Sequence, residues 1–301
     1  MNYIYSGLMR SYFLIVLFSL TLLAAATSSA QDVPGAITFH IYSTHTSFPD
    51  TGRAKGHIYD DKLYTVNEHY WDSTVLIIAP KNLDVKKKVD LVFWFHGWGN
   101  NVDSAATRYE LTKQFIESKR NAVLVLAETA RNSPDSYGGR LETPGDFKAL
   151  VADVLQGLKA KGLIPQKCIS GHILLAGHSG AYRVMARIIK NGEMPIDEAM
   201  LFDALYAETD IFVDWLKADQ LHRFIHLFTD HGGTLDESHN MNKLLDDGDI
   251  NYFQVEEKDL VPAELRAHSI IFIHSLKQHN DIVNPDNFRL MLENEPFLKA
   301  L

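Results

Sequence analysis

The sequence predicts an α/β fold: a mostly parallel, eight-stranded sheet with helices on both faces, giving three layers. Apolar runs of strand length alternate along the chain with longer amphipathic segments, which is the order of elements in a parallel sheet covered by helices. The strand-length runs are almost continuously Val, Ile, Leu and Phe, as expected for strands buried on both faces.

Eight apolar runs of strand length are the expected strands. In chain order they span residues 37–42, 73–79, 89–95, 122–127, 173–176, 199–202, 224–228 and 270–274.

Five amphipathic segments are the expected helices, and they fall between the strands. They span residues 104–120, 144–161, 182–190, 209–221 and 237–245. Asp103 directly precedes the first segment, and we expect it to be the N-cap of that helix. Because no repeat or linker interrupts the pattern, residues 31–301 are expected to form one domain.

Composition narrows the class of function. The chain has 301 residues, of which 46% are hydrophobic and 22% charged, as in ordinary globular domains. Its net charge is -9, and its basic residues form no stripe with interleaved aromatics, so we expect no nucleic-acid partner. The single cysteine, Cys168, excludes an intramolecular disulfide. Composition leaves the oligomeric state open.

The first thirty residues predict an export signal. Arg10 precedes an apolar run from Tyr12 to Ala26, and Ser28 and Ala30 occupy the two small-residue positions of a cleavage site. The run is shorter than the roughly 20 residues that a spanning helix needs. We therefore expect cleavage after Ala30, export to the periplasm or the cell exterior, and no stable membrane insertion of the mature chain.

The strongest chemical signal is Gly177-His178-Ser179-Gly180-Ala181, where an apolar strand runs directly into a helix. The small residues two positions before and after Ser179 permit the sharp, strained turn that raises a serine hydroxyl above the sheet edge. There the hydroxyl would lie at a helix N-terminus, where backbone N–H groups stabilise a developing oxyanion. We expect Ser179 to be a nucleophile and the N–H of Gly180 to be one oxyanion donor.

This segment resembles the Gly-x-Ser-x-Gly signature of the α/β-hydrolase superfamily, with Ala181 in place of the last glycine. It follows the fifth expected strand, where the superfamily places its nucleophile, and the resemblance extends over essentially the whole mature chain. The resemblance implies an α/β-hydrolase fold, a Ser-His-Asp triad and an activity like that of secreted bacterial serine esterases and lipases.

The segment His96-Gly97-Trp98 follows the third expected strand and resembles the His-Gly oxyanion loop of the superfamily. This implies that the backbone N–H of Trp98 is the second oxyanion donor, opposite Gly180; the Trp98 side chain is alternatively a pocket wall. His96 is expected to orient the loop through hydrogen bonds. The residues expected to border the substrate pocket are His96, Gly97, His178 and Tyr206.

His279 lies in the polar loop after the last expected strand, where the superfamily carries its catalytic histidine. A neutral imidazole can accept the serine proton at neutral pH and deliver it to a leaving group. His268 precedes the strand, at the wrong edge of the sheet, and His274 lies within it. We expect His279 to be the general base.

Two aspartates compete for the role of triad acid. Asp203 ends the sixth expected strand and Asp230 ends the seventh. The superfamily usually takes its acid after the seventh strand, whereas a minority of members take it after the sixth. The segments around Asp203 and from His231 to Thr234 resemble segments of secreted bacterial relatives, which favours Asp203 and leaves Asp230 as the alternative.

Together these features predict an exported serine hydrolase that cleaves a carboxylic ester through an acyl-enzyme, without cofactor or metal. A small or medium-sized acyl compound is the expected substrate, and residues 130–143 are expected to wall its pocket. Two alternatives remain: an amidase or peptidase with the same triad, and a non-catalytic binding protein on the hydrolase fold. Four neighbouring histidines lack a ligand spacing typical of zinc: His222, His226, His231 and His239.

Overall fold

The structure is a computed structural model, and it describes residues 33–301. The expected signal segment, residues 1–30, lies outside the described residues and stays a prediction. Between residues 33 and 301 no helix is both long and apolar enough to cross a membrane.

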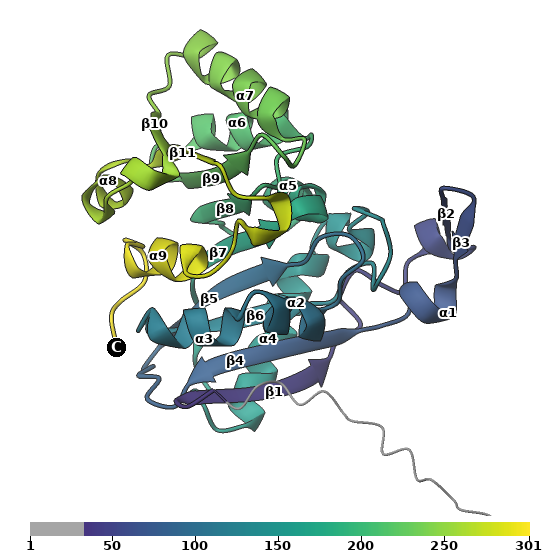
Figure 1. The fold of residues 1–301 in the computed structure, drawn as a ribbon. Helices are drawn as coiled ribbons and strands as arrows, with labels where there is room; N and C mark the ends of the chain where they lie inside the picture. The colour runs from purple at the N-terminus through teal and green to yellow at the C-terminus, as the bar shows by residue number, and fades with distance from the viewer. Residues whose placement is uncertain (1–32) are drawn as a thin grey trace, which may run out of the picture.

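A mostly parallel sheet of nine strands forms the centre of the described chain (Figure 1), in the order β1-β4-β6-β5-β7-β8-β9-β11-β10. The pairs β1–β4 and β4–β6 are antiparallel, and the other pairs are parallel. All eight expected strands are present. The strands are β1 Ala36–Tyr42, β4 Thr74–Pro80, β5 Lys88–Phe95, β6 Ala122–Ala127, β7 Ile169–His178, β8 Glu198–Phe202, β9 Arg223–Thr229, β10 Phe253–Glu256 and β11 Ile270–Ser275.

The expected strand number of eight is wrong by one, because β10 was not predicted. β10 lies at the edge of the sheet and pairs only with β11. Its sequence, Phe-Gln-Val-Glu, alternates apolar and polar residues, and none of them is fully buried. An edge strand of this kind lacks the continuous apolar run that marks the buried strands.

Helices cover both faces of the sheet, as expected for three layers. Successive side chains of β5 point to opposite faces, so Phe93 packs in one core and Trp94 in the other. The first core is covered by α4 Asp146–Ala160, α5 Tyr182–Asn191, α6 Thr209–Ala218 and α7 Leu235–Asp247. The second core is covered by α2 Val102–Arg108, α3 Leu111–Glu117, α8 Pro262–Ala267 and α9 Asn287–Glu293.

The helix expected over residues 104–120 is two helices, α2 and α3. The break lies at Glu110, whose φ of 46° is left-handed, and the side chain of Gln114 donates a 2.7 Å hydrogen bond to the Tyr109 carbonyl. This bond satisfies a carbonyl that a continuous helix would have used. The expected N-cap is also wrong: Asn101, and not Asp103, accepts the hydrogen bond from the first turn.

An insertion that sequence patterns did not reveal leaves the sheet between β1 and β4. It carries β2 His57–Tyr59, β3 Lys62–Tyr64 and α1 Val66–His69, and it projects to one side of the sheet in Figure 1. Arg53 of this insertion pairs with Asp135 at 2.6 Å, and the Tyr59 ring meets the Trp98 ring edge-on with 5.3 Å between centroids. The insertion therefore supports both the 130–143 loop and the loop after β5.

Candidate active site

Ser179 occupies a sharp turn between β7 and α5. It opens a short 3-10 helix, Ser179–Ala181, and its φ of 56° lies in the left-handed region. A non-glycine residue in this region carries backbone strain of about 1–3 kcal/mol, and such strain is concentrated at functional sites. A Cβ on Gly177 would lie 2.5 Å from the Cβ of Ala181, so only small residues fit on both sides of the turn.

The loop after β5 packs directly against this turn. A Cβ on Gly97 would lie 2.6 Å from the Cβ of Ser179. Beneath the loop, His96 is buried; its Nδ1 donates to the Gly97 carbonyl at 2.8 Å, and its Nε2 lies 2.6 Å from Glu128 Oε1. His96 thus holds the loop from below.

This arrangement also orients the N–H of Trp98. In a trans peptide the C=O and N–H groups point in opposite directions. Because the Gly97 carbonyl points at the His96 ring, the N–H of Trp98 points away from that ring. Within residues 33–301 this N–H has no hydrogen-bond acceptor. It can therefore serve a bound oxyanion.

His279 is joined to Asp203. Its Nδ1 donates to Asp203 Oδ2 at 2.5 Å, which leaves the lone pair of Nε2 free to accept a proton. The carboxylate is fully buried and also accepts from the Thr234 hydroxyl and, at 3.4 Å, from the Thr229 N–H. A Cβ on Gly232 would fall 1.6 Å from Oδ2, so the loop after β9 closes around the carboxylate only because residue 232 is glycine.

Asp230, the alternative acid, is engaged elsewhere. Its Oδ1 lies 2.9 Å from Nε2 of His274, whose Nδ1 faces both carboxylate oxygens of Glu256 at 3.0 Å. Although burial opposes it, the hydrogen bonds to Glu256 and Asp230 raise the pKa of His274. The structure therefore places Asp203, and not Asp230, on His279.

His178 holds the loop of His279 in position. Its Nε2–H donates to the His279 carbonyl at 2.9 Å, and its Nδ1 lies 3.1 Å from the Tyr109 hydroxyl. Burial, reinforced by the neighbouring His279, lowers the pKa of His178 to about 3, so its ring is neutral near pH 7. A neutral ring with one donor and one acceptor matches the two partners that it has.

Ser179 and His279 both line one cavity of about 530 Å³. No direct hydrogen bond joins the two side chains in the described chain; catalytic hydrogen bonds are often long without substrate and tighten when it binds. Of the expected pocket residues, Gly97, His178 and Tyr206 line the cavity. His96 does not, which corrects our expectation, because its ring faces Glu128 below the loop. The expected oxyanion donors, Trp98 and Gly180, and one residue of the 130–143 segment, Ser136, also line it.

Solved structures resemble the whole described fold. A ferulic acid esterase superposes with a TM-score of 0.56 at 12% identity, over 88% of this chain and 98% of that one. A mutant of the feruloyl esterase module from Clostridium thermocellum, complexed with sinapinate, gives a TM-score of 0.57 at 9% identity, over 92% and 94%. The chain has an α/β-hydrolase fold. No protein-family model matches the sequence, and no curated protein matches it significantly.

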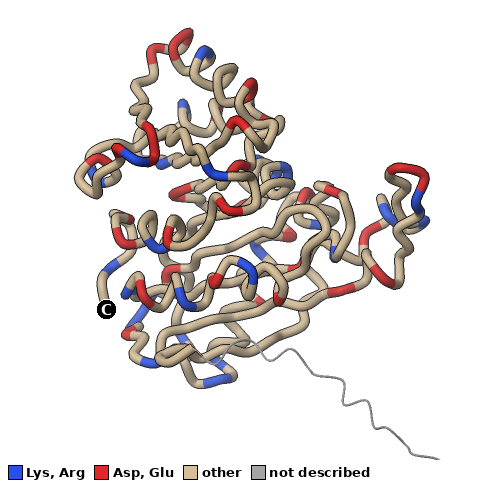
Figure 2. Tube along the Cα trace, in the orientation of Figure 1, with Lys and Arg blue, Asp and Glu red and all other residues tan. Residues whose placement is uncertain are grey.

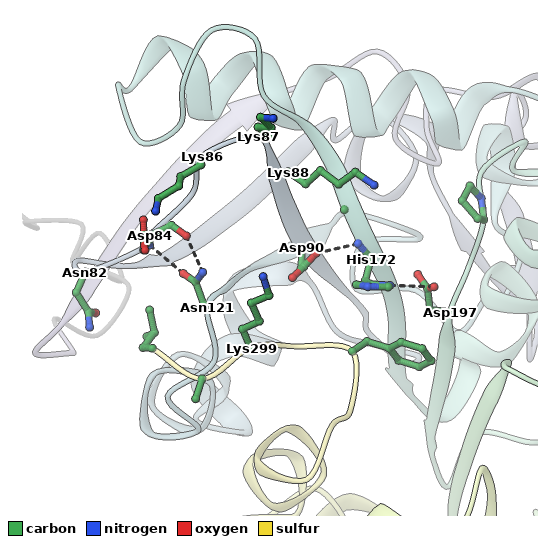
Figure 3. Close-up of a pocket in the computed structure, with 15 residues that line it drawn as sticks. Asn82, Asp84, Lys86, Lys87, Lys88, Asp90, Asn121, His172, Asp197 and Lys299 are labelled. Carbon is green, nitrogen blue, oxygen red and sulfur yellow. Dashed lines mark hydrogen bonds and ion pairs between the residues drawn. The ribbon is translucent and has the colours of Figure 1, made fainter.

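A second cavity of this α/β-hydrolase fold, of about 820 Å³, is larger but lies at the opposite edge of the sheet. Figure 3 shows it at the amino ends of the strands, with Lys88, Lys299 and Asp90 around it. Asp90 and Asp197 are both occupied in hydrogen bonds with His172. Its lining has no serine or cysteine. The smaller cavity, which holds Ser179, is therefore the candidate active site.

Two supporting residues of the candidate active site were missed from the sequence. Glu128 directly follows β6, so the rule that singled out the aspartates after β8 and β9 would also have found it. Tyr109 follows α2 and gives no comparable signal. Within residues 33–301, no three His, Cys, Asp or Glu side chains are grouped closely enough to hold a metal ion.

Proposed function

We propose that this chain is a serine hydrolase that cleaves carboxylic esters, with Ser179 as nucleophile, His279 as general base and Asp203 as the acid that orients it. The observation that carries the proposal is the hydrogen bond between His279 and Asp203 in the same cavity as the strained turn of Ser179. This combination supports the proposal because it offers a hydroxyl in a strained turn and, in the same cavity, a base with a free lone pair and a fixed tautomer.

The reaction follows from these positions. Nε2 of His279 takes the proton of the Ser179 hydroxyl while Oγ attacks the ester carbonyl carbon. The N–H groups of Trp98 and Gly180 donate to the resulting oxyanion, and the imidazolium returns its proton to the leaving alcohol. A water molecule then attacks the acyl-enzyme carbonyl while Nε2 of His279 takes its proton. The imidazolium returns this proton to Oγ of Ser179, which releases the carboxylic acid and restores the serine. Asp203 remains ionised throughout and stabilises the imidazolium.

Aromatic walls favour a substrate with a planar apolar part. A cavity of about 530 Å³ suits a small or medium-sized molecule. The names of the two similar structures, a ferulic acid esterase and a feruloyl esterase module, agree with an ester as substrate. The aromatic residues that line the cavity are Trp98, Tyr109, Tyr182 and Tyr206.

Positive and negative side chains are interspersed over the described chain (Figure 2), which favours a small-molecule partner over a nucleic acid.

Export is part of the proposal. An apolar segment followed by Ser28 and Ala30 is typical of a cleaved signal, and cleavage would leave Gln31 as the first residue. Expression of the full sequence with N-terminal sequencing of the fractionated protein tests this point. A cytoplasmic protein that retains residues 1–30 would contradict it.

The decisive experiment for the activity uses a fluorophosphonate probe, which reacts with activated serines. We expect it to label the wild-type protein and not the Ser179→Ala variant, while both give the same circular dichroism spectrum. Rates on an ester and an amide with the same acyl group then separate an esterase from an amidase. Absence of labelling in folded wild-type protein would refute the proposal and favour a non-catalytic binding protein.

A further inference from the structure

One cation lines the candidate active-site cavity, and no carboxylate residue is among the residues that line it. Of the thirteen residues that line the cavity, Arg108 is the only Lys or Arg, and none is Asp or Glu. Arg108 is the last residue of α2 and its side chain is exposed. It makes no ion pair with any of the described residues. The cavity therefore presents a net positive group to whatever enters it.

The backbone holds Arg108 at the cavity. Asn284 donates to its carbonyl oxygen at 3.3 Å, and Tyr109, the next residue, is fixed by its contact with buried His178. The guanidinium carbon lies 5.8 Å from the centroid of the Tyr109 ring. These contacts tether the main chain while they leave the five N–H donors of the guanidinium free for a ligand.

The charge of Arg108 acts on the cavity walls. Burial is the main cause of the low pKa of His178, and the charge of Arg108 adds to it. Burial raises the pKa of Tyr109 to about 12; the charge of Arg108 opposes that rise, and the smaller effect of the Asp281 carboxylate adds to it. The molecule as a whole carries a net charge of -9, which repels anions. Arg108 therefore offers an anionic ligand a local positive charge within a molecule whose net charge is negative.

We propose that Arg108 selects esters that carry a carboxylate away from the scissile bond, so that the substrate class is an anionic ester. A guanidinium binds a carboxylate through two parallel hydrogen bonds, which gives both affinity and orientation. The proposal rests on the proposed ester hydrolysis at Ser179. The competing explanation is structural: an arginine in the last turn of a helix complements the helix dipole, and then it would not distinguish substrates.

The test compares two pairs of esters. Within each pair, one member carries a carboxylate and the other carries a neutral carboxamide at the same position. One pair, para-acetoxybenzoate and para-acetoxybenzamide, carries the group on the alcohol. The other, the para-nitrophenyl monoesters of glutaric and glutaramic acid, carries it on the acyl chain. In wild type we expect kcat/KM to favour the carboxylate member of at least one pair. In Arg108→Gln that preference should fall at least about tenfold, mainly through KM, because the glutamine amide replaces the paired, charge-assisted hydrogen bonds with at most a neutral one.

Two control variants separate this effect from general electrostatics. Lys148→Gln removes the same charge from α4, on the other face of the sheet, and should keep the wild-type preference. Arg108→Lys retains the charge but not the paired donors, and should retain part of the preference. Unfolding temperatures of all variants report any effect on α2.

The outcomes are distinguishable. A preference that Arg108→Gln leaves unchanged in both pairs, or a wild type without preference in either, overturns the role of Arg108 while hydrolysis itself continues. A lower unfolding temperature with an unchanged preference supports the structural explanation. If no ester is hydrolysed and the fluorophosphonate probe does not label Ser179, the proposed function fails, and not the selection by Arg108 alone.

Discussion

Replacing Asp203 by asparagine tests the triad at its most decisive contact. Oδ1 of Asp203 accepts from the N–H of Thr229, which can only donate, and Oδ2 accepts from Nδ1 of His279. In Asp203→Asn the amide oxygen must therefore stay at Thr229, and the NH2 group must face His279. The imidazole can keep this contact only by accepting at Nδ1, which moves its proton to Nε2 and removes the lone pair that would accept the Ser179 proton.

The expected loss follows from that change of tautomer. Loss of base catalysis with the geometry retained should lower kcat about 10³–10⁴-fold, which corresponds to about 4–5 kcal/mol in the activation barrier. KM should change little, because Asp203 does not line the cavity. The assay measures kcat and KM on a para-nitrophenyl ester near pH 8, with thermal unfolding as a check on the fold.

Asp230→Asn is the matched control. It also replaces one carboxylate oxygen by an NH2 group, but Asp230 contacts His274 and not His279, so kcat should stay within about threefold of wild type. The reasoning would be refuted by the opposite pattern, in which Asp203→Asn retains most of its activity and Asp230→Asn loses it. Equal losses in both variants would also contradict the reasoning, because Asp230 contacts His274 and Asp203 contacts His279.

Three further predictions concern residues around the triad. Gly97→Ala places a Cβ 2.6 Å from that of Ser179 and 2.9 Å from the His178 carbonyl oxygen, so the loop after β5 must shift. We expect kcat to fall about 100-fold and urea unfolding to show a loss of about 1–3 kcal/mol from the overpacking. Unimpaired turnover would contradict the placement of this loop. Tyr109→Phe leaves Nδ1 of His178 buried without a donor and should cost about 1–3 kcal/mol in urea unfolding. Burial lowers the pKa of His226 to about 4, below the usual histidine value of 6.5. The neutral ring therefore contributes stability that is fully present above pH 6.5 and is lost as the pH falls towards 4; between pH 7.5 and pH 5 the free energy of unfolding should fall by about 2 kcal/mol from this group. His226→Gln should abolish this pH-dependent loss in urea unfolding measured at the two pH values.

The central strands could be predicted because each is buried on both faces and so reads as a continuous apolar run. β6 and β8 are buried along their whole length. β10 could not be predicted this way, since an edge strand with one neighbour has half-exposed, alternating residues. The division between α2 and α3 was also hidden, because the left-handed residue at the break is Glu110, which no propensity rule marks as a helix end.

Ser179 and His279 could be predicted to share a site because the motif around Ser179 and the superfamily resemblance single them out, and because the carboxyl ends of parallel strands meet at one edge of the sheet. The same rule could not separate Asp203 from Asp230, since both follow neighbouring parallel strands and so begin at that edge. Side-chain direction decides between them, and it depends on how closely the 232–234 loop approaches. A glycine at residue 232 permits that approach, because any Cβ there would displace the Asp203 carboxylate.

The oxyanion loop shows the same dependence of chemistry on a buried contact. His96 was expected both to orient the loop and to border the pocket, and these two roles exclude each other. A histidine whose two nitrogens are directed at Glu128 and the Gly97 carbonyl has no nitrogen left for a substrate. In the proposed mechanism this contact acts through the Trp98 N–H, which donates to the oxyanion. Glu128→Gln, at a residue that does not line the cavity, should therefore still lower kcat more than it raises KM.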